Sequence, residues 1–119
     1  MVNVAVLVGR LTKDPQVNVT PNNKKVLNFT LAVNRDKENT DFINCVAWER
    51  TAELIGQYTH KGSQLGISGK IQTRTRKDKD DRTIYITEVW VNDIMFLDSK
   101  KEETQYENPI DVKTDNLPF

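Results

Sequence analysis

The order of strand-like and helix-like segments constrains this chain most strongly. Five segments favour β-strands, because apolar residues alternate with polar ones or form short runs bounded by turn residues. They are residues 2–11, 25–35, 41–48, 63–75 and 82–92. Between the third and the fourth, residues 49–62 change to helical spacing, with Leu54, Ile55 and Tyr58 on one side. Gly62 is predicted to end this short helix, so the chain should be mostly β.

Strand, strand, strand, helix, strand, strand is the order of a five-stranded Greek-key barrel of the OB type, with its helix between strands three and four. We therefore expect an all-β domain over residues 1–98, with a charged hairpin loop at 76–81 and a last apolar piece at 93–97. Residues 99–114 are polar and predict a flexible linker. Residues 115–119 form an apolar tip on a disordered C-terminal tail.

Several classes of function are disfavoured by what the sequence contains. Cys45 is the single cysteine and His60 the single histidine, so neither an internal disulfide nor a Cys/His zinc site is expected. No convergent set of acid, base and nucleophile is recognisable, which predicts a non-enzymatic protein without cofactor or metal. No apolar run approaches the roughly 20 residues of a membrane span, and no signal peptide begins the sequence. We expect a soluble, cytoplasmic protein.

The charge is unevenly distributed along the chain. The formal net charge is zero, yet residues 1–98 carry 14 Lys or Arg against 12 Asp or Glu, and residues 99–119 carry 3 against 5. Basic residues concentrate in residues 70–82. Since phosphate binding is largely electrostatic, this local excess of basic residues is compatible with a nucleic-acid ligand despite the zero net charge.

The strand at 41–48 has two different faces. Period-two alternation places Ile43, Cys45 and Ala47 on one face, which is typical of a core. The other face carries Phe42 and Trp48 at its ends. Exposed aromatic rings can stack on the bases of single-stranded nucleic acid, so both residues are predicted to bind the ligand, the alternative being burial in the core.

Basic residues that could contact phosphates lie at strand ends and at alternating positions of the fourth strand. The candidates are Arg35, Lys37, Arg50, Lys70, Arg74 and Arg76. Tyr85 is a further candidate, because it lies beside the basic loop, on the face of its strand opposite to Ile84 and Ile86. Trp90 shares its parity with Ile84 and Ile86, which favours a core or subunit contact for it.

These residues resemble a known family. The segments "NVAVLVGRLTKDP", "FTLAVNR", "DFINCVAWER", "KGSQLGISGKIQTR" and "ITEV" are similar, in this order, to the bacterial and phage single-stranded DNA-binding proteins. The resemblance implies an OB barrel, assembly into a homo-oligomer that is usually a homotetramer, and DNA wrapped around the outside. Phe42 and Trp48 match two stacking aromatics of that family. Lys37 and Arg76 stand where many members have Trp, which predicts a more salt-sensitive binding.

The resemblance also gives the C-terminal tip a role. In the family the tip docks replication, recombination and repair enzymes, and the matching residues here are Asp115, Asn116, Leu117, Pro118 and Phe119. A single acid, Asp115, directly precedes Asn116, where members often have three. We expect weaker or altered partner binding, the alternative being that Phe119 folds back onto its own barrel.

Three hypotheses follow. The first is sequence-independent binding and protection of single-stranded DNA during replication, recombination and repair, with recruitment of enzymes through residues 115–119. The second is an OB-fold adaptor that chiefly binds proteins, and the third is an OB-fold RNA binder. The sequence leaves open a dimer or a tetramer, the size of the binding site, and a cellular or phage origin.

Overall fold

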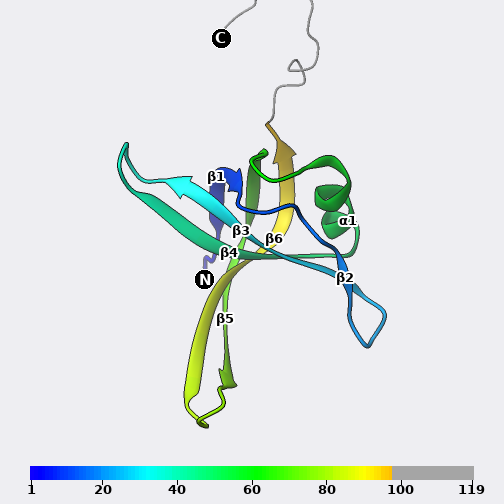
Figure 1. Cartoon of the computed structure of the whole chain (residues 1–119), viewed down its shortest axis with the longest axis vertical. Helices are drawn as coiled ribbons and strands as arrows, with labels where there is room; N and C mark the ends of the chain where they lie inside the picture. The colour runs from blue at the N-terminus through cyan, green and yellow to red at the C-terminus, as the bar shows by residue number, and fades with distance from the viewer. Residues whose placement is uncertain (98–119) are drawn as a thin grey trace, which may run out of the picture.

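Five strands close into a barrel in the computed structural model, which describes residues 1–97 (Figure 1). The strands are β1 (Ala5–Leu11), β3 (Lys25–Asn34), β4 (Thr40–Trp48), β5 (Gln64–Lys77) and β6 (Thr83–Phe96), with a short β2 (Asn18–Val19) added at the edge of β3. The order is β1-β5-β6-β4-β3-β2, and β1 also pairs with β3, which closes the ring. The predicted all-β, OB-type fold is confirmed.

Helix α1 (Glu49–Tyr58) connects β4 to β5 and packs against β3, β4 and β6. Its Ala52 and Ile55 are fully buried in the core that the barrel encloses. On β4 the predicted core face is confirmed, because Cys45 and Ala47 are buried and Ile43 packs against them. No helix within residues 1–97 is long and apolar enough to cross a membrane.

The end of the helix differs from the prediction. Helix α1 ends at Tyr58, because the backbone of Thr59 is extended, with φ −130° and ψ 165°. The N–H and the Oγ1 of Thr59 both donate to the carbonyl oxygen of Ile55, at 3.2 and 2.6 Å, and cap this end. Gly62 lies in the turn that follows, with a positive φ of 90°. The predicted stop at Gly62 was wrong, and Tyr58 is 62% exposed instead of packing on the core.

The last two strands are longer than the sequence indicated. Arg76 and Lys77 continue β5 and pair with β6, so the predicted loop shrinks to a turn held by Asp78, whose Oδ1 accepts from the N–H groups of Asp80 and Arg82. The apolar piece predicted at 93–97 is largely the end of β6. The register shifts between Ser68 and Gly69, which leaves Asn92 of β6 without a partner on β5, and a Cβ on Gly69 would overlap the carbonyl oxygen of Trp90. Glycine therefore permits this close pairing.

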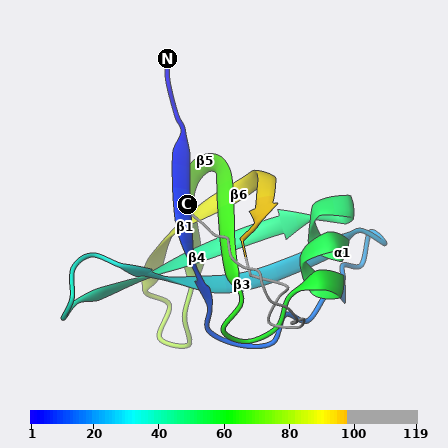
Figure 2. The same ribbon diagram turned by 90° about the horizontal axis from the view of Figure 1, so that it is seen from above.

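Two hairpins extend away from the barrel. The β5–β6 hairpin points along the long axis of the molecule and the β3–β4 hairpin points sideways, while residues 12–24 run past α1 (Figures 1 and 2). The space between these elements is where the candidate site lies.

Candidate nucleic-acid interface

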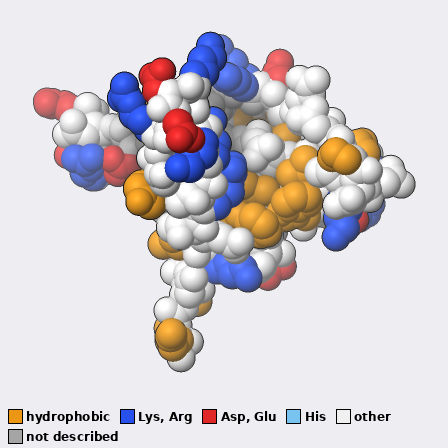
Figure 3. Space-filling model, turned by 90° about the horizontal axis from the view of Figure 1, so that it is seen from below, with side chains coloured by type: hydrophobic (Ala, Val, Ile, Leu, Met, Phe, Trp, Pro, Cys, Tyr) orange, Lys and Arg blue, Asp and Glu red, His pale blue; other side chains and the backbone are white. Residues whose placement is uncertain are grey.

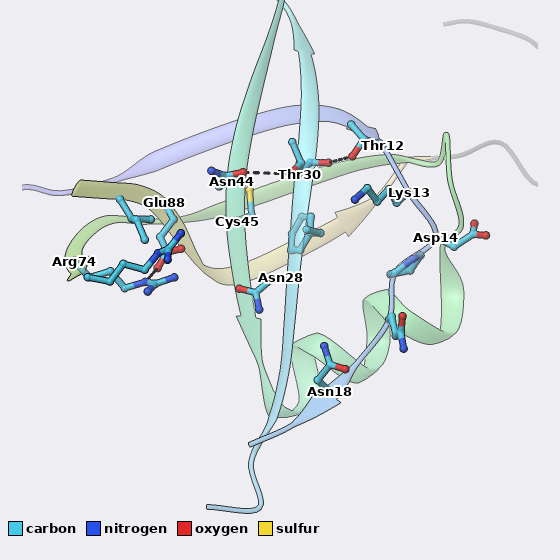
Figure 4. A pocket seen from close by; sticks show the side chains of 15 residues that line it. Thr12, Lys13, Asp14, Asn18, Asn28, Thr30, Asn44, Cys45, Arg74 and Glu88 are labelled. Carbon is cyan, nitrogen blue, oxygen red and sulfur yellow. Dashed lines mark hydrogen bonds and ion pairs between the residues drawn. The ribbon is translucent and has the colours of Figure 1, made fainter. Parts of the chain in front are cut away.

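A groove with a volume of about 580 Å³ lies between the segment after β1, the strands β3 and β4, and the β5–β6 hairpin. Figure 4 shows that its side chains come from three directions. Arg74 and Glu88 belong to the hairpin, Lys13 and Asp14 to the segment after β1, and Asn28, Thr30 and Asn44 to the strands between them. The lining is mostly polar, unlike a typical small-molecule pocket.

The floor of the groove consists of amide and hydroxyl groups. Thr30 Oγ1 donates to Asn44 Oδ1 at 3.2 Å, across the pair in which β3 and β4 place these residues opposite each other. Thr12 Oγ1 donates to the carbonyl oxygen of Thr30 at 3.3 Å. Asn28 and Thr30 were not predicted as site residues, although the alternation in residues 25–34 that buries Leu27, Phe29 and Leu31 places them on the outer face of the strand.

The two predicted stacking aromatics differ in accessibility. Phe42 is 65% exposed and lies two residues from Asn44, on the face of β4 that forms the groove floor. Trp48 is only partly exposed, because its ring packs against Trp90 with the centroids 5.6 Å apart. Its Nε1 is buried and has no hydrogen-bond partner within residues 1–97. Phe42 therefore offers the more open ring.

Three of the predicted basic residues share one face of β5. Lys70, Arg74 and Arg76 alternate along the strand and lie opposite Trp90, Ile86 and Ile84 of β6. Arg74 and Arg76 line the groove. Lys70 and Arg76 form no ion pair in the described part of the chain, whereas Arg74 Nε donates to Glu88 Oε1 at 3.0 Å.

Other predicted contacts lie outside the groove. Arg35 donates two hydrogen bonds to Asp41, at 2.6 and 3.3 Å. Asp41 lies opposite Val33, which packs against the core, so this pair is on the other face of β4 from the groove floor. This hydrogen bond lowers the pKa of Asp41 and raises that of Arg35. Lys37 is exposed in the turn between β3 and β4.

Arg50 and Tyr85 also lie apart from the groove. Arg50 lines a second groove, of about 550 Å³, between α1 and Val17 and Val19, and its Nη1 is 3.9 Å from Glu53. Tyr85 is 79% exposed and stands opposite Thr75, so it faces away from Arg74 and Arg76. Contact of Arg35, Lys37, Arg50 and Tyr85 with a ligand stays a prediction.

The chemistry of the groove is that of binding. Cys45 borders it, but burial and the neighbouring Glu88 raise the pKa of the thiol to about 12, so the thiolate needed for nucleophilic attack is not formed near neutral pH. No cluster of three or more metal-ligating side chains is found among the described residues. In Figure 3, Lys and Arg side chains border an apolar area in a hollow of the surface.

The comparison with known proteins agrees with this geometry. The model of the "Single-strand binding protein family" matches residues 2–97. This chain belongs to that family. It is 48% identical to the single-stranded DNA-binding protein of Oceanobacillus iheyensis, over 84% of this chain and 66% of the relative, and 44% identical to that of Halalkalibacterium halodurans, over 93% and 70%. It is 38% identical to single-stranded DNA-binding protein 3 of Streptococcus agalactiae, over the whole of both.

Membership of the single-strand binding protein family confirms the resemblance read from the sequence segments. It also makes the chain a member of a family of binding proteins and not of enzymes, as the sequence predicted. The matched region ends where the described structure ends, so the predicted linker at 99–114 and the tip at 115–119 lie outside the described residues.

Proposed function

We propose that this chain binds single-stranded DNA, with little preference for sequence, in the groove between the β5–β6 hairpin and the β3–β4 floor. One observation carries the proposal. The exposed ring of Phe42 lies on the outward face of β4, and the unpaired cations Lys70 and Arg76 lie on the outward face of β5, on the other side of β6. A floor of amides and hydroxyls lies beside them. Unpaired nucleotides offer the matching groups, a π-face on each base and a charge on each phosphate.

Each part of the groove has a role in this proposal. Arg76 in the groove contacts a phosphate. Outside the lining, Lys70 on the same face of β5 contacts another phosphate, and Phe42 on the same face of β4 as Asn44 stacks on a base. Asn28, Thr30 and Asn44 can each donate and accept, so they can form hydrogen bonds with any of the four bases. Stacking and phosphate contacts do not distinguish sequences, which supports sequence-independent binding.

Fluorescence polarisation with a labelled dT oligonucleotide tests the proposal. We expect saturable binding that unlabelled dT competes away, and that duplex DNA of the same length competes away poorly because its bases are not accessible for stacking. A matched rU oligonucleotide is the second competitor. Failure to bind dT, or equal competition by duplex, would reject the proposal, and stronger competition by rU would favour the RNA-binding hypothesis.

We further propose that the protein acts as a homo-oligomer, with four copies as the first expectation. Val6 and Val8 on β1 and Met95 on β6 are 70%, 47% and 63% exposed, and Gly66 of β5 pairs with both Val8 and Met95. They form an apolar sheet face that a second copy would cover. Sedimentation equilibrium should give a multiple of the 13.7 kDa chain mass, and a monomer at micromolar concentration would contradict this.

The cellular role that we propose is protection of single-stranded DNA in the cytoplasm during replication, recombination and repair. Recruitment of enzymes through residues 115–119 belongs to the same proposal, and its support is the apolar and acidic sequence of that segment. Deleting residues 115–119 should leave the affinity for dT unchanged and abolish co-sedimentation with a partner enzyme of the replication or repair machinery.

A further inference from the structure

The groove proposed to bind DNA contains a buried acidic residue, Glu88, which is unexpected for a site that binds phosphates. Glu88 is 5% exposed and lines the groove beside Arg74 and Arg76. A carboxylate repels phosphates, and its burial is unfavourable unless hydrogen bonds and an opposite charge offset the loss of water. The contacts of Glu88 therefore require an explanation beyond packing.

One oxygen of Glu88 accepts hydrogen bonds from a groove-lining arginine and from a neighbouring tryptophan. Its Oε1 accepts from Arg74 Nε at 3.0 Å and from Trp90 Nε1 at 3.1 Å. The Trp90 ring packs in turn against Trp48. Glu88 thus connects Arg74 with the Trp48–Trp90 pair.

The contact with Glu88 changes what Arg74 offers to a ligand. Its positive charge is balanced by the carboxylate, while its side chain remains 51% exposed. Within residues 1–97 the two Nη groups have no hydrogen-bond partner, so their donors and the flat guanidinium face are free. Arg76, two residues along the same face, has no ion pair in that part of the chain and keeps its full charge.

We propose that Glu88 is a positioning residue that makes Arg74 a base-contacting group instead of a phosphate-neutralising one. The inference rests on the proposed binding of single-stranded DNA. Arg74 presents its Nη donors and its planar face to a base, because a guanidinium group can stack on a base and form hydrogen bonds with its edge as well as bind phosphate. Phosphates are left to the unpaired cations, Lys70 and Arg76.

The salt dependence of binding separates these two roles of an arginine. Each phosphate neutralised on single-stranded DNA contributes about 0.7 to the slope of log Kd against log salt concentration. An arginine whose charge is already balanced contributes little to this slope, even when it adds affinity. When the charge of Glu88 is removed, the charge of Arg74 is no longer balanced, so Arg74 should contribute to the salt slope.

The experiment measures the slope for the full-length chain with a labelled dT oligonucleotide, in four proteins besides the wild type. Glu88→Gln keeps the shape and an acceptor oxygen for Arg74 and Trp90 but removes the charge. Arg74→Gln removes the cation, and the double variant completes the cycle. Glu38→Gln is the matched control, because Glu38 is exposed in the β3–β4 turn and its carboxylate has no partner in the described structure.

We expect Glu88→Gln to steepen the slope by about 0.7, and Arg74→Gln to remove that increase only in the Glu88→Gln background. In the wild-type background Arg74→Gln should weaken dT binding severalfold with an unchanged slope, and should not weaken binding to an abasic oligonucleotide of equal length. Glu38→Gln should leave the slope unchanged.

Three results would overturn the inference. They are an unchanged slope in a folded Glu88→Gln protein, a slope lowered by Arg74→Gln alone, and an equal loss of affinity for dT and abasic oligonucleotides. If Glu88→Gln does not fold, the last two measurements still decide, because they use Arg74→Gln only. A wild-type chain that does not bind dT would instead reject the proposed function.

Discussion

Replacing Phe42 by Ala tests the base-stacking role at its most exposed point. The ring is 65% exposed on the same face of β4 as the groove-lining Asn44, so its removal takes away a stacking surface and very little core packing. Stacking on one base contributes about 1–3 kcal/mol by alanine substitution, which corresponds to a Kd for dT higher by about 5- to 160-fold. The free energy of unfolding should change by less than about 0.5 kcal/mol.

Fluorescence polarisation with dT gives the Kd, and urea unfolding gives the stability. Phe42→Tyr keeps the ring and should bind within about twofold of the wild type, since it retains the π-face. Tyr58→Ala is the control, because Tyr58 is a 62% exposed ring that packs edge-on against Phe96, outside the groove. A folded Phe42→Ala protein with wild-type Kd, or an equal loss in Tyr58→Ala, would refute the stacking role.

Four further outcomes are expected. Arg76→Gln should lower the salt slope of dT binding by about 0.7, because Arg76 has no ion pair in the described residues and would neutralise one phosphate. Leu27→Ala should lower the free energy of unfolding by about 2–5 kcal/mol in urea titrations, because the side chain is fully buried. Arg35→Gln should raise the pKa of Asp41 towards its ordinary value of 3.8 in an NMR titration, since it removes the hydrogen bond that lowers it. The pKa of Asp41 is lower in the folded than in the unfolded protein. The pair with Arg35 therefore stabilises the folded wild type at pH values above the ordinary pKa of Asp41, and this stabilisation is lost as the pH falls through the lowered pKa. The Cys45 thiol, with its pKa raised to about 12, should react with a thiol reagent at about pH 8 only after unfolding.

The sequence predicted the parts of the fold that depend on local periodicity. The alternation in residues 41–48 identified the buried face of β4, and the same rule placed Tyr85 on the opposite face of β6 from Ile84 and Ile86. These predictions held because side-chain direction in a strand follows from position alone.

The features that the sequence did not predict depend on contacts between residues far apart in the chain. Val46 has the parity of the outer face of β4 but is 4% exposed, because β6 pairs beside it and Trp90 lies opposite. The same pairing brings Trp90 against Trp48 and leaves the Trp48 indole partly covered. The pairing of Arg74 with Glu88 likewise needs the register of β5 against β6, which composition does not give.

The parallel contact between β4 and β6, which links the β5–β6 hairpin to the β3–β4 hairpin within the barrel, cannot be predicted from the order of strands along the chain. It consists of two residue pairs, Cys45 with Val89 and Val46 with Trp90, and the members of each pair are 44 positions apart. Joining such distant segments loses chain entropy before any contact is gained, and topologies rich in distant contacts fold slowly. We therefore expect this short junction to form late in folding, after the β5–β6 hairpin, whose strands are close in sequence.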